Sequence, residues 1–345
     1  MQHLLWGATV APAPPKDAPP VRAAARRAAV LAWTLALTAC APRADEAPPA
    51  KAAPPVAVAA ASLESPAPVP APEAADAPDV AMAKHWKGFG VAKCSYLAPR
   101  EDFIGDDGGV DVVFHFHAGQ MSEREMRESG VRGVFVSCGY GIGSGGYARA
   151  FADEGRFGFM MKRLTRAIGR EANRSDVHLR RLTLASWSAG FAAISRILAV
   201  PEWYEATDTV VLLDSLHAQY VDGEGPARGA DRVDVKMLKR FVRFASDAAA
   251  GKKTMVITHS AIVPPDYAST SEATAALLFE VGVVPAATNE KTARGMTTST
   301  AADEGGLHVR GFRGMGPQDH FDHLHMIGAV LRTWVVPRWS AAQNR

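Results

Sequence analysis

The chain is poor in cysteine and has almost no excess charge. Its 345 residues include three cysteines, and 38 Lys and Arg residues nearly balance 36 Asp and Glu residues, which leaves a formal net charge of +2. A charge this small and dispersed is not that of a nucleic-acid-binding surface, so we expect no nucleic-acid partner. Beyond Cys40, near the N-terminus, only Cys94 and Cys138 remain. These two form either one disulfide bond, as an oxidising compartment favours, or two buried free thiols.

The sequence also lacks a long apolar run. The stretch Ala28–Ala39 is shorter than the roughly 20 residues that a transmembrane helix needs. It follows Arg22, Arg26 and Arg27, and small residues lead from it into Cys40. This order resembles a bacterial lipoprotein signal, which implies that Cys40 is lipidated after cleavage. An ordinary signal peptide or a short membrane anchor is the alternative.

Residues 41–83 have too few large apolar side chains to form a core. They are almost wholly Ala, Pro and small polar residues, which is typical of an extended, disordered tether. We therefore expect a signal segment (1–40), a tether (41–83) and one folded domain (84–345). A lipid anchor on such an arm implies a location in the bacterial cell envelope. By resemblance to enterobacterial sorting rules, Ala41 rather than Asp after the cysteine implies the outer membrane, facing the periplasm or the cell surface.

From residue 84 onward, β-branched apolar runs alternate with amphipathic stretches. This alternation predicts a mostly parallel sheet flanked by helices in three layers. The chain before residue 111 has room for one short strand pair around 90–97, so the sheet is expected to be trimmed at that edge. The segment between 281 and 307, rich in Thr, Ala and Gly, is expected to be a loop. The predicted strands are 111–117, 131–137, 179–185, 209–213, 253–258 and 307–311, and the main predicted helices are 121–129, 147–170, 235–249, 271–281 and 320–336.

The pattern Ser186-x-Ser188-x-Gly190 lies between a predicted strand and an apolar, helix-prone segment. A serine on such a sharp turn has its hydroxyl exposed beside the N–H groups of a helix N-terminus, where negative charge is favoured. Small residues must flank the turn. Ser186 stands where the commoner pattern has Gly, so the turn has to be interpreted with the rest of the chain.

Two further residues follow Ser188 at the ends of predicted elements. Asp214 ends the next strand, and His320 follows the last strand, at the beginning of the last helix. The chain order Ser, Asp, His resembles that of the α/β-hydrolase superfamily, and the resemblance spans nearly the whole folded domain. It implies a serine hydrolase in which Ser188 is the nucleophile, His320 the general base and Asp214 the acid. Asp266 and His323 are the alternates.

The resemblance also implies an oxyanion hole and a substrate-facing segment. The segment from His115 to Gly119 ends the first long strand and resembles the His-Gly loop of esterases. Backbone N–H groups of Ala118, Gly119 and Ala189 would then stabilise the oxyanion. Strand alternation puts His115 and His117 on one face. His217 and Tyr220, which follow Asp214, are expected to face the substrate.

Three other interpretations fit parts of the sequence. The glycines of Gly141-x-Gly143-x-x-Gly146 fit a dinucleotide motif, but no acidic residue ends the next strand, so a flexible loop beside the active site is favoured and no cofactor is expected. The cluster His320, His323 and His325 would suit a metal-dependent hydrolase, although a His-Glu-x-x-His motif is lacking. A non-catalytic envelope-binding lipoprotein with a hydrolase fold is the third. The favoured interpretation is an envelope-anchored hydrolase of an ester or amide, acting on a small molecule or an envelope component.

Overall fold

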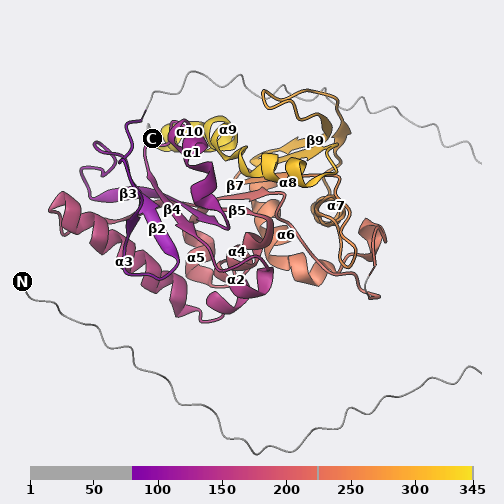
Figure 1. The fold of residues 1–345 in the computed structure, drawn as a ribbon, viewed down its shortest axis with the longest axis horizontal. Helices are drawn as coiled ribbons and strands as arrows, with labels where there is room; N and C mark the ends of the chain where they lie inside the picture. Colours follow the sequence, from indigo (N-terminus) through magenta and orange to yellow (C-terminus); the bar gives the residue numbers. More distant parts are fainter. Residues whose placement is uncertain (1–79, 224, 344–345) are drawn as a thin grey trace, which may run out of the picture. The chain divides into compact units, whose positions relative to one another are not determined.

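The predicted strands come together in one sheet. The computed structural model describes residues 80–223 and 225–343, and there ten strands pair in the order β1-β2-β4-β3-β5-β6-β7-β10-β9-β8 (Figure 1). The strands from β4 to β10 are parallel, whereas both edges are antiparallel. The strands are Lys87–Gly88 (β1), Cys94–Leu97 (β2), Gly109–Phe116 (β3), Val134–Cys138 (β4), His178–Trp187 (β5), Thr207–Leu213 (β6), Thr254–His259 (β7), Ala286–Ala287 (β8), Thr298–Glu304 (β9) and Leu307–Phe312 (β10).

Helices cover both faces of the sheet, and a separate apolar cluster fills each interface (Figure 1). This arrangement confirms the predicted three-layer α/β sandwich with a mostly parallel sheet. None of the described helices is both long and apolar enough to cross a membrane. One layer comprises Ser144–Ala150 (α2), Gly155–Ala172 (α3), Phe191–Ile197 (α4), Pro201–Ala206 (α5), Val235–Ala249 (α6) and Thr270–Val281 (α7). The other comprises Glu123–Arg127 (α1), Pro317–Leu324 (α8), Ile327–Val330 (α9), the π-helical Leu331–Val335 and Val336–Gln343 (α10).

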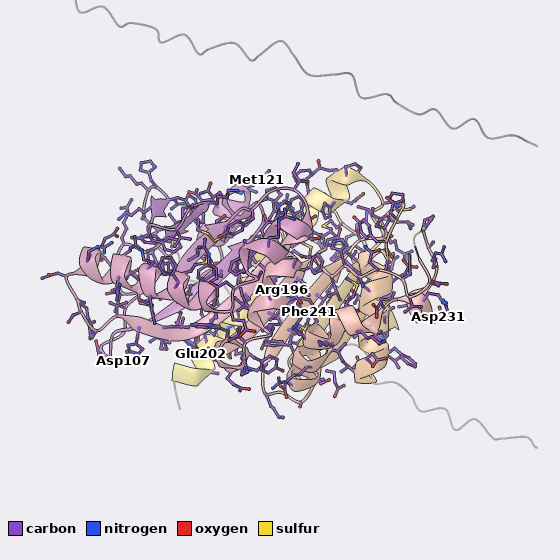
Figure 2. All side chains as sticks on the ribbon, turned by 90° about the horizontal axis from the view of Figure 1, so that it is seen from below. Asp107, Met121, Arg196, Glu202, Asp231 and Phe241 are labelled. Carbon is purple, nitrogen blue, oxygen red and sulfur yellow. A yellow bond between two sulfur atoms is a disulfide. The ribbon has the colours of Figure 1, made fainter. Side chains whose placement is uncertain are left out.

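Helix α6 shows how the sequence pattern produces this packing. Leu238, Phe241 and Phe244 recur every three residues, and each is at most 1% exposed. Phe241 is labelled among the side chains in Figure 2. That spacing puts them on one helical face, toward the core. The Asp234 side chain caps the helix by accepting a hydrogen bond from the Lys236 N–H at 3.2 Å. The helix therefore begins and ends where the sequence predicts.

Three predictions about these elements were wrong. The single helix predicted over 320–336 is divided into α8, α9, the π-helical segment and the start of α10. The supposed loop before residue 307 contains β9, which pairs with β10 through a turn at Gly305 and Gly306. Gly305 has a φ of +55°, and a Gly-Gly pair between two strands is a strong hairpin signal. The single helix predicted over 147–170 is two helices, α2 and α3. The Asp153 side chain accepts a hydrogen bond from the Gly155 N–H at 3.0 Å, which favours a new helical start there.

The N-terminal edge is trimmed, as expected, because β1 and β2 are short and antiparallel. Cys94 lies directly opposite Cys138 in the β2–β4 pair, and a disulfide joins them. Met82 pairs with Pro99 and is 5% exposed, so packing begins before the predicted boundary at residue 84. The predicted signal segment with Cys40 and the tether up to residue 79 lie outside the described residues.

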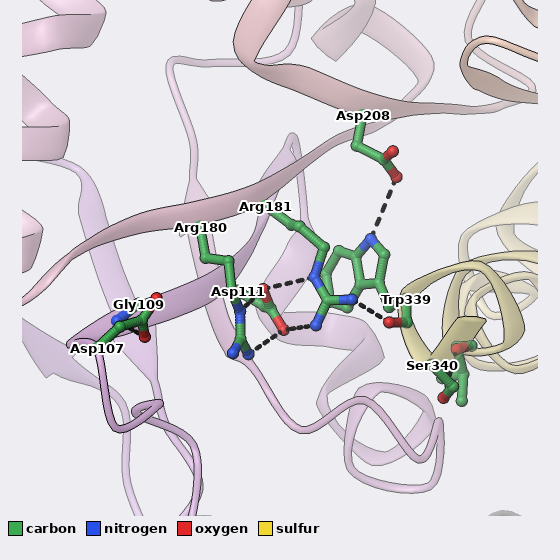
Figure 3. Close-up of polar contacts among 9 residues, drawn as sticks. Asp107, Gly109, Asp111, Arg180, Arg181, Asp208, Trp339 and Ser340 are labelled. Atoms are coloured by element: carbon green, nitrogen blue, oxygen red, sulfur yellow. Dashed lines mark hydrogen bonds and ion pairs between the residues drawn. The ribbon is translucent and has the colours of Figure 1, made fainter. Parts of the chain in front are cut away.

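A buried ion cluster links β3 and β5 to the C-terminal helix (Figure 3). Asp111, which is 2% exposed, accepts hydrogen bonds from the Nε atoms of Arg180 and Arg181 at 2.9 and 2.8 Å. Arg181 also donates to the backbone carbonyl of Trp339 and lies over its indole ring. The Trp339 Nε1–H donates to Asp208 of β6 at 3.2 Å. The Asp111 carboxylate thus joins β3 to β5, and Arg181 extends the cluster to α10.

We expect Asp111→Ala to lower the free energy of unfolding by about 3–5 kcal/mol, because two partly buried arginines would lose their carboxylate. Urea titration of wild type and variant measures the change. Asp176→Ala is the matched control, since it removes the exposed partner of Arg174 and should have a much smaller effect. Equal effects of the two substitutions would contradict a stabilising role for the cluster.

Candidate active site

Ser188 occupies a sharp turn between β5 and α4. Its φ is +51°, a left-handed conformation that a non-glycine residue keeps only where the surrounding structure holds it. Gly190 cannot carry a side chain, since a Cβ there would lie 2.3 Å from the Phe116 carbonyl oxygen and 2.9 Å from the Ser186 Cβ. The strand therefore passes into the helix through the close turn that the sequence predicts.

Ser186 has a structural use at the position where the commoner pattern has Gly. Its Oγ lies 2.8 Å from the Ser215 Oγ, and that hydroxyl donates to the Ser188 carbonyl oxygen at 2.6 Å. Both Ser186 and Ser215 are fully buried. Because the Ser215 proton is engaged, Ser186 acts as the donor to it. The two hydroxyls therefore stabilise the turn through a chain of hydrogen bonds that ends at the Ser188 carbonyl.

The carboxylate of Asp214 orients His320. Asp214 is 2% exposed, and its Oδ2 accepts a hydrogen bond from the His320 Nδ1–H at 2.7 Å. Its Oδ1 accepts from the Ser260 N–H at 2.9 Å and from the Thr270 hydroxyl. Burial acts to raise the pKa of Asp214, but the hydrogen bond from His320, nearby His323 and the other two donors outweigh it and hold the pKa well below its ordinary value. With Nδ1 held in this way, the His320 Nε2 is available to take a proton.

Ser188, Asp214 and His320 line one cavity of about 420 Å³. The Trp187 ring lies 4.5 Å from the His320 imidazole, centroid to centroid, and its Nε1–H donates to the His320 carbonyl at 2.8 Å. Within the described ranges no hydrogen bond directly joins the Ser188 Oγ to His320. Contacts of this kind often tighten only when substrate binds. The structure thus brings the three residues to one cavity, with the two side chains of the Asp–His pair already bonded.

A second cavity, also of about 420 Å³, shares Ser188, His217 and Tyr267 with the first. The glycine-rich loop borders it through Gly143 and Ser144, which places that loop beside Ser188 as predicted. The first cavity has a largely apolar wall of Ile262, Val263, Pro264, Pro265, Met315 and Pro317. The second is lined further by Ile142, Ala189, Phe191, Ala218, Gln219 and Met237.

The alternates lie elsewhere. Asp266 is exposed and makes no hydrogen bond or ion pair with the described residues. His323 is fully buried, with its Nδ1 2.7 Å from the Thr258 Oγ1. The His325 Nδ1 lies 3.1 Å from the Glu125 Oε1. His320, His323 and His325 therefore face three different partners, and no three His, Cys, Asp or Glu side chains in the described part of the chain are grouped to hold a metal ion.

Of the three residues proposed for the oxyanion hole, one lines a cavity together with Ser188. Ala189 lines the second cavity beside Ser188. Ala118 lines a different cavity, and Gly119 packs so closely on the sheet that a Cβ would lie 2.9 Å from the Ser137 Oγ. The predicted placement of His117 beside His115 was wrong, because β3 ends at Phe116 and His117 has a φ of +74°.

His117 instead contributes an aromatic contact that the sequence did not indicate. Its ring stacks on Trp187 with the centroids 5.1 Å apart, so Trp187 lies between His117 and His320. The His117 Nδ1 is 2.8 Å from the Tyr147 hydroxyl. Burial lowers the pKa of His117, and the proximity of His320 lowers it further. A neutral ring is therefore packed beside the site.

His217 and Tyr220 have different environments. His217 lines both cavities, as expected of a substrate-facing residue. Tyr220 was expected to do the same, but it is 5% exposed, and its hydroxyl donates to the Glu272 carboxylate at 2.8 Å. Its hydrogen bond to α7 directs it into the core.

Comparison with known proteins adds little to this geometry. No family model and no curated protein matches the chain. LpqC, a poly(3-hydroxybutyrate) depolymerase from Bordetella parapertussis, is 15% identical with a TM-score of 0.38, and the alignment covers 69% of this chain and 83% of that one. An esterase from Pseudomonas putida ECU1011 is 12% identical with a TM-score of 0.37, with 75% and 82% covered. A fungal esterase from Rhizomucor miehei is 12% identical with a TM-score of 0.36, with 75% and 84% covered. Similarities this weak say nothing about activity, so function has to be argued from the site.

The buried His115 predicts a loss of stability in acid. It is fully buried, neither ring nitrogen has a hydrogen-bond partner among the described residues, and burial lowers its pKa to about 3. The unfolded chain binds a proton at this residue below a pH of about 6.5, whereas the folded protein does not until near pH 3. The contribution of neutral His115 to the free energy of unfolding is therefore complete above pH 6.5 and is lost as the pH falls.

We expect His115→Leu to remove this contribution. Between pH 7.5 and pH 5 the free energy of unfolding should fall by about 2 kcal/mol less in the variant than in the wild type. Urea titrations at both pH values measure the difference, and His178→Gln, at an exposed histidine, should behave like the wild type. An unchanged pH dependence in His115→Leu would show that His115 is not the titrating group.

Proposed function

We propose that this protein is a serine hydrolase that cleaves a carboxylic ester or amide through Ser188, His320 and Asp214. The observation that supports this most is the 2.7 Å hydrogen bond from His320 Nδ1 to the buried Asp214 at a cavity that Ser188 also lines. The left-handed backbone of Ser188 adds support, because strain of this kind is typical of a nucleophile turn.

The proposed reaction has two stages. His320 Nε2 takes the Ser188 proton as Oγ attacks the carbonyl carbon, and the N–H of Ala189 at the start of the helical turn stabilises the oxyanion. The imidazolium then protonates the leaving oxygen or nitrogen, that bond breaks, and the acyl group stays on Ser188. Water next gives a proton to His320 and attacks the acyl group, after which Ser188 regains its proton as the acid leaves. Contributions of Ala118 and Gly119 to the oxyanion hole belong to the same proposal.

A fluorophosphonate probe tests this function directly. The probe should attach to Ser188 in the peptide Leu182–Arg196, which trypsin releases by cleaving after Arg181 and Arg196. A chelator should leave both labelling and ester turnover unchanged. Chelator-sensitive turnover without labelling would favour a metal-dependent hydrolase. The absence of both labelling and turnover would favour the non-catalytic binding lipoprotein.

We also propose that lipidated Cys40 and the tether hold this hydrolase in the bacterial cell envelope, where a small molecule or an envelope component is its substrate. The support is the order of basic, apolar and small residues before Cys40. Metabolic labelling with a clickable fatty acid should modify the wild type but not Cys40→Ser. Equal labelling of both would overturn the anchor.

A further inference from the structure

His217 is a polar side chain of the site that the proposed mechanism does not use. It borders both cavities at Ser188. Its ring lies between Phe191 and Tyr267, with centroid distances of 5.3 and 5.6 Å. The two aromatic rings fix the orientation of the imidazole, so its nitrogens have defined directions.

The two nitrogens of His217 have different surroundings. Nδ1 is buried without a hydrogen-bond partner in the described part of the chain. Nε2 has no partner there either but is accessible, so it faces the cavities that His217 lines. Burial lowers the pKa of His217 to about 4, although Asp214 opposes the shift, so the ring is neutral at pH 7. Because a buried N–H without a partner is more costly than a buried lone pair, we assign the proton to Nε2.

His217 is not placed to be a second general base. Both carboxylate oxygens of Asp214 already accept hydrogen bonds from His320, Ser260 and Thr270. A purely structural ring between two aromatic residues would be satisfied by phenylalanine, which has no unpartnered nitrogen. A buried polar atom left unsatisfied requires an explanation, and a ligand contact at the other nitrogen supplies one.

The positions of His320 and His217 assign the two cavities to the two halves of a substrate. His320 must protonate the leaving group, and it lines only the first cavity. The acyl group therefore extends into the second cavity. His217 borders both, so Nε2 reaches atoms close to the scissile carbonyl.

We propose that the His217 Nε2–H selects the substrate by donating a hydrogen bond to an oxygen atom in the acyl group near the scissile carbonyl. The preferred substrates are then esters of short acids that carry an oxygen substituent, rather than their hydrocarbon analogues. This inference rests on the proposed hydrolase function.

Two p-nitrophenyl esters test the contact. The methoxyacetate and the butyrate differ by one oxygen in place of one CH₂ group at the β position. The kcat/KM for the methoxyacetate is divided by that for the butyrate. Dividing this ratio by the ratio of the two rates of hydrolysis by hydroxide corrects for the difference in intrinsic reactivity and gives a corrected ratio. A hydrogen bond of ordinary strength should give the wild type a corrected ratio of about 10.

The expected result is a corrected ratio near one for His217→Phe, because methoxyacetate turnover falls further than butyrate turnover. His217→Gln keeps an N–H donor and should retain part of the preference, which also guards against a folding defect in the phenylalanine variant. His178→Phe makes the same replacement at the N-terminal end of β5, far from Ser188 at the other end, and should leave the corrected ratio unchanged.

The outcomes separate this inference from the function on which it rests. A wild-type ratio that persists in His217→Phe overturns the specificity role and leaves the hydrolase intact. Loss of fluorophosphonate labelling in a folded His217→Phe would also overturn it, because His217 would then belong to the catalytic machinery. Absence of turnover of both esters by the wild type overturns the proposed function and this inference together.

Discussion

Replacing Ser188 with alanine should lower kcat for p-nitrophenyl butyrate by at least about 10⁴-fold, because the covalent route is lost and only transition-state binding remains. KM should change little, since the hydroxyl contributes little to ground-state binding. Initial rates over a range of substrate concentrations measure both parameters. Urea titration of the same preparation should show an intact domain.

Ser195→Ala is the matched control for Ser188. It removes a hydroxyl from the same tryptic peptide, seven residues further along in α4. The Ser195 hydroxyl accepts a long hydrogen bond from Arg240 at 3.5 Å. This variant should keep full activity and full labelling. Turnover that survives in Ser188→Ala would remove Ser188 from the nucleophile role.

Asp214→Asn should lower kcat by about 10⁴-fold, with little change in KM. The amide keeps the size of the carboxylate but cannot stabilise the imidazolium of His320. An amide N–H facing Nδ1 would also favour the tautomer with its proton on Nε2, which cannot accept the proton of Ser188. Steady-state kinetics at pH 7.5 and the rate of fluorophosphonate labelling should both show the loss.

Asp266→Asn is the control for Asp214. Asp266 is exposed on the segment after β7, so its variant should match the wild type in kcat and labelling rate. The reverse result, with Asp266→Asn inactive and Asp214→Asn active, would move the acid role to Asp266. It would also require the segment to rearrange when substrate binds.

The sequence predicted the elements whose burial leaves a local pattern. Helix α6 has apolar residues at helical spacing, and the central strands are continuous β-branched runs. Strand β9 has no such signal: its Thr, Ser, Ala and Asp side chains are small or polar, and its backbone pairing with β10 holds it in the sheet. The Gly305–Gly306 pair before β10 is the one local signal that predicts the β9–β10 hairpin.

The chain order of the three proposed catalytic residues could be predicted from the sequence because parallel strands end at one edge of a sheet. Each of the three follows the C-terminal end of a strand: Ser188 follows β5, Asp214 follows β6 and His320 follows β10. The parallel sheet therefore brings them to one edge. The bracing of Ser188 by Ser215, the contact of His117 with Trp187 and the burial of Tyr220 depend on side chains that meet only in the folded chain. No spacing rule reports such contacts.

The two ends of strand β5 belong to different parts of the molecule. Arg180 and Arg181, near its start, belong to the ion cluster around Asp111, whereas Ser188 follows its last residue. Ten residues of extended chain put about 30 Å between these ends. The segments that border the cavities, around Gly143, Pro264 and Met315, can therefore change without disturbing the ion cluster. The architecture should thus tolerate substitution of its substrate-facing rim, which makes that rim the favourable place to diversify the chain in a search for new specificities.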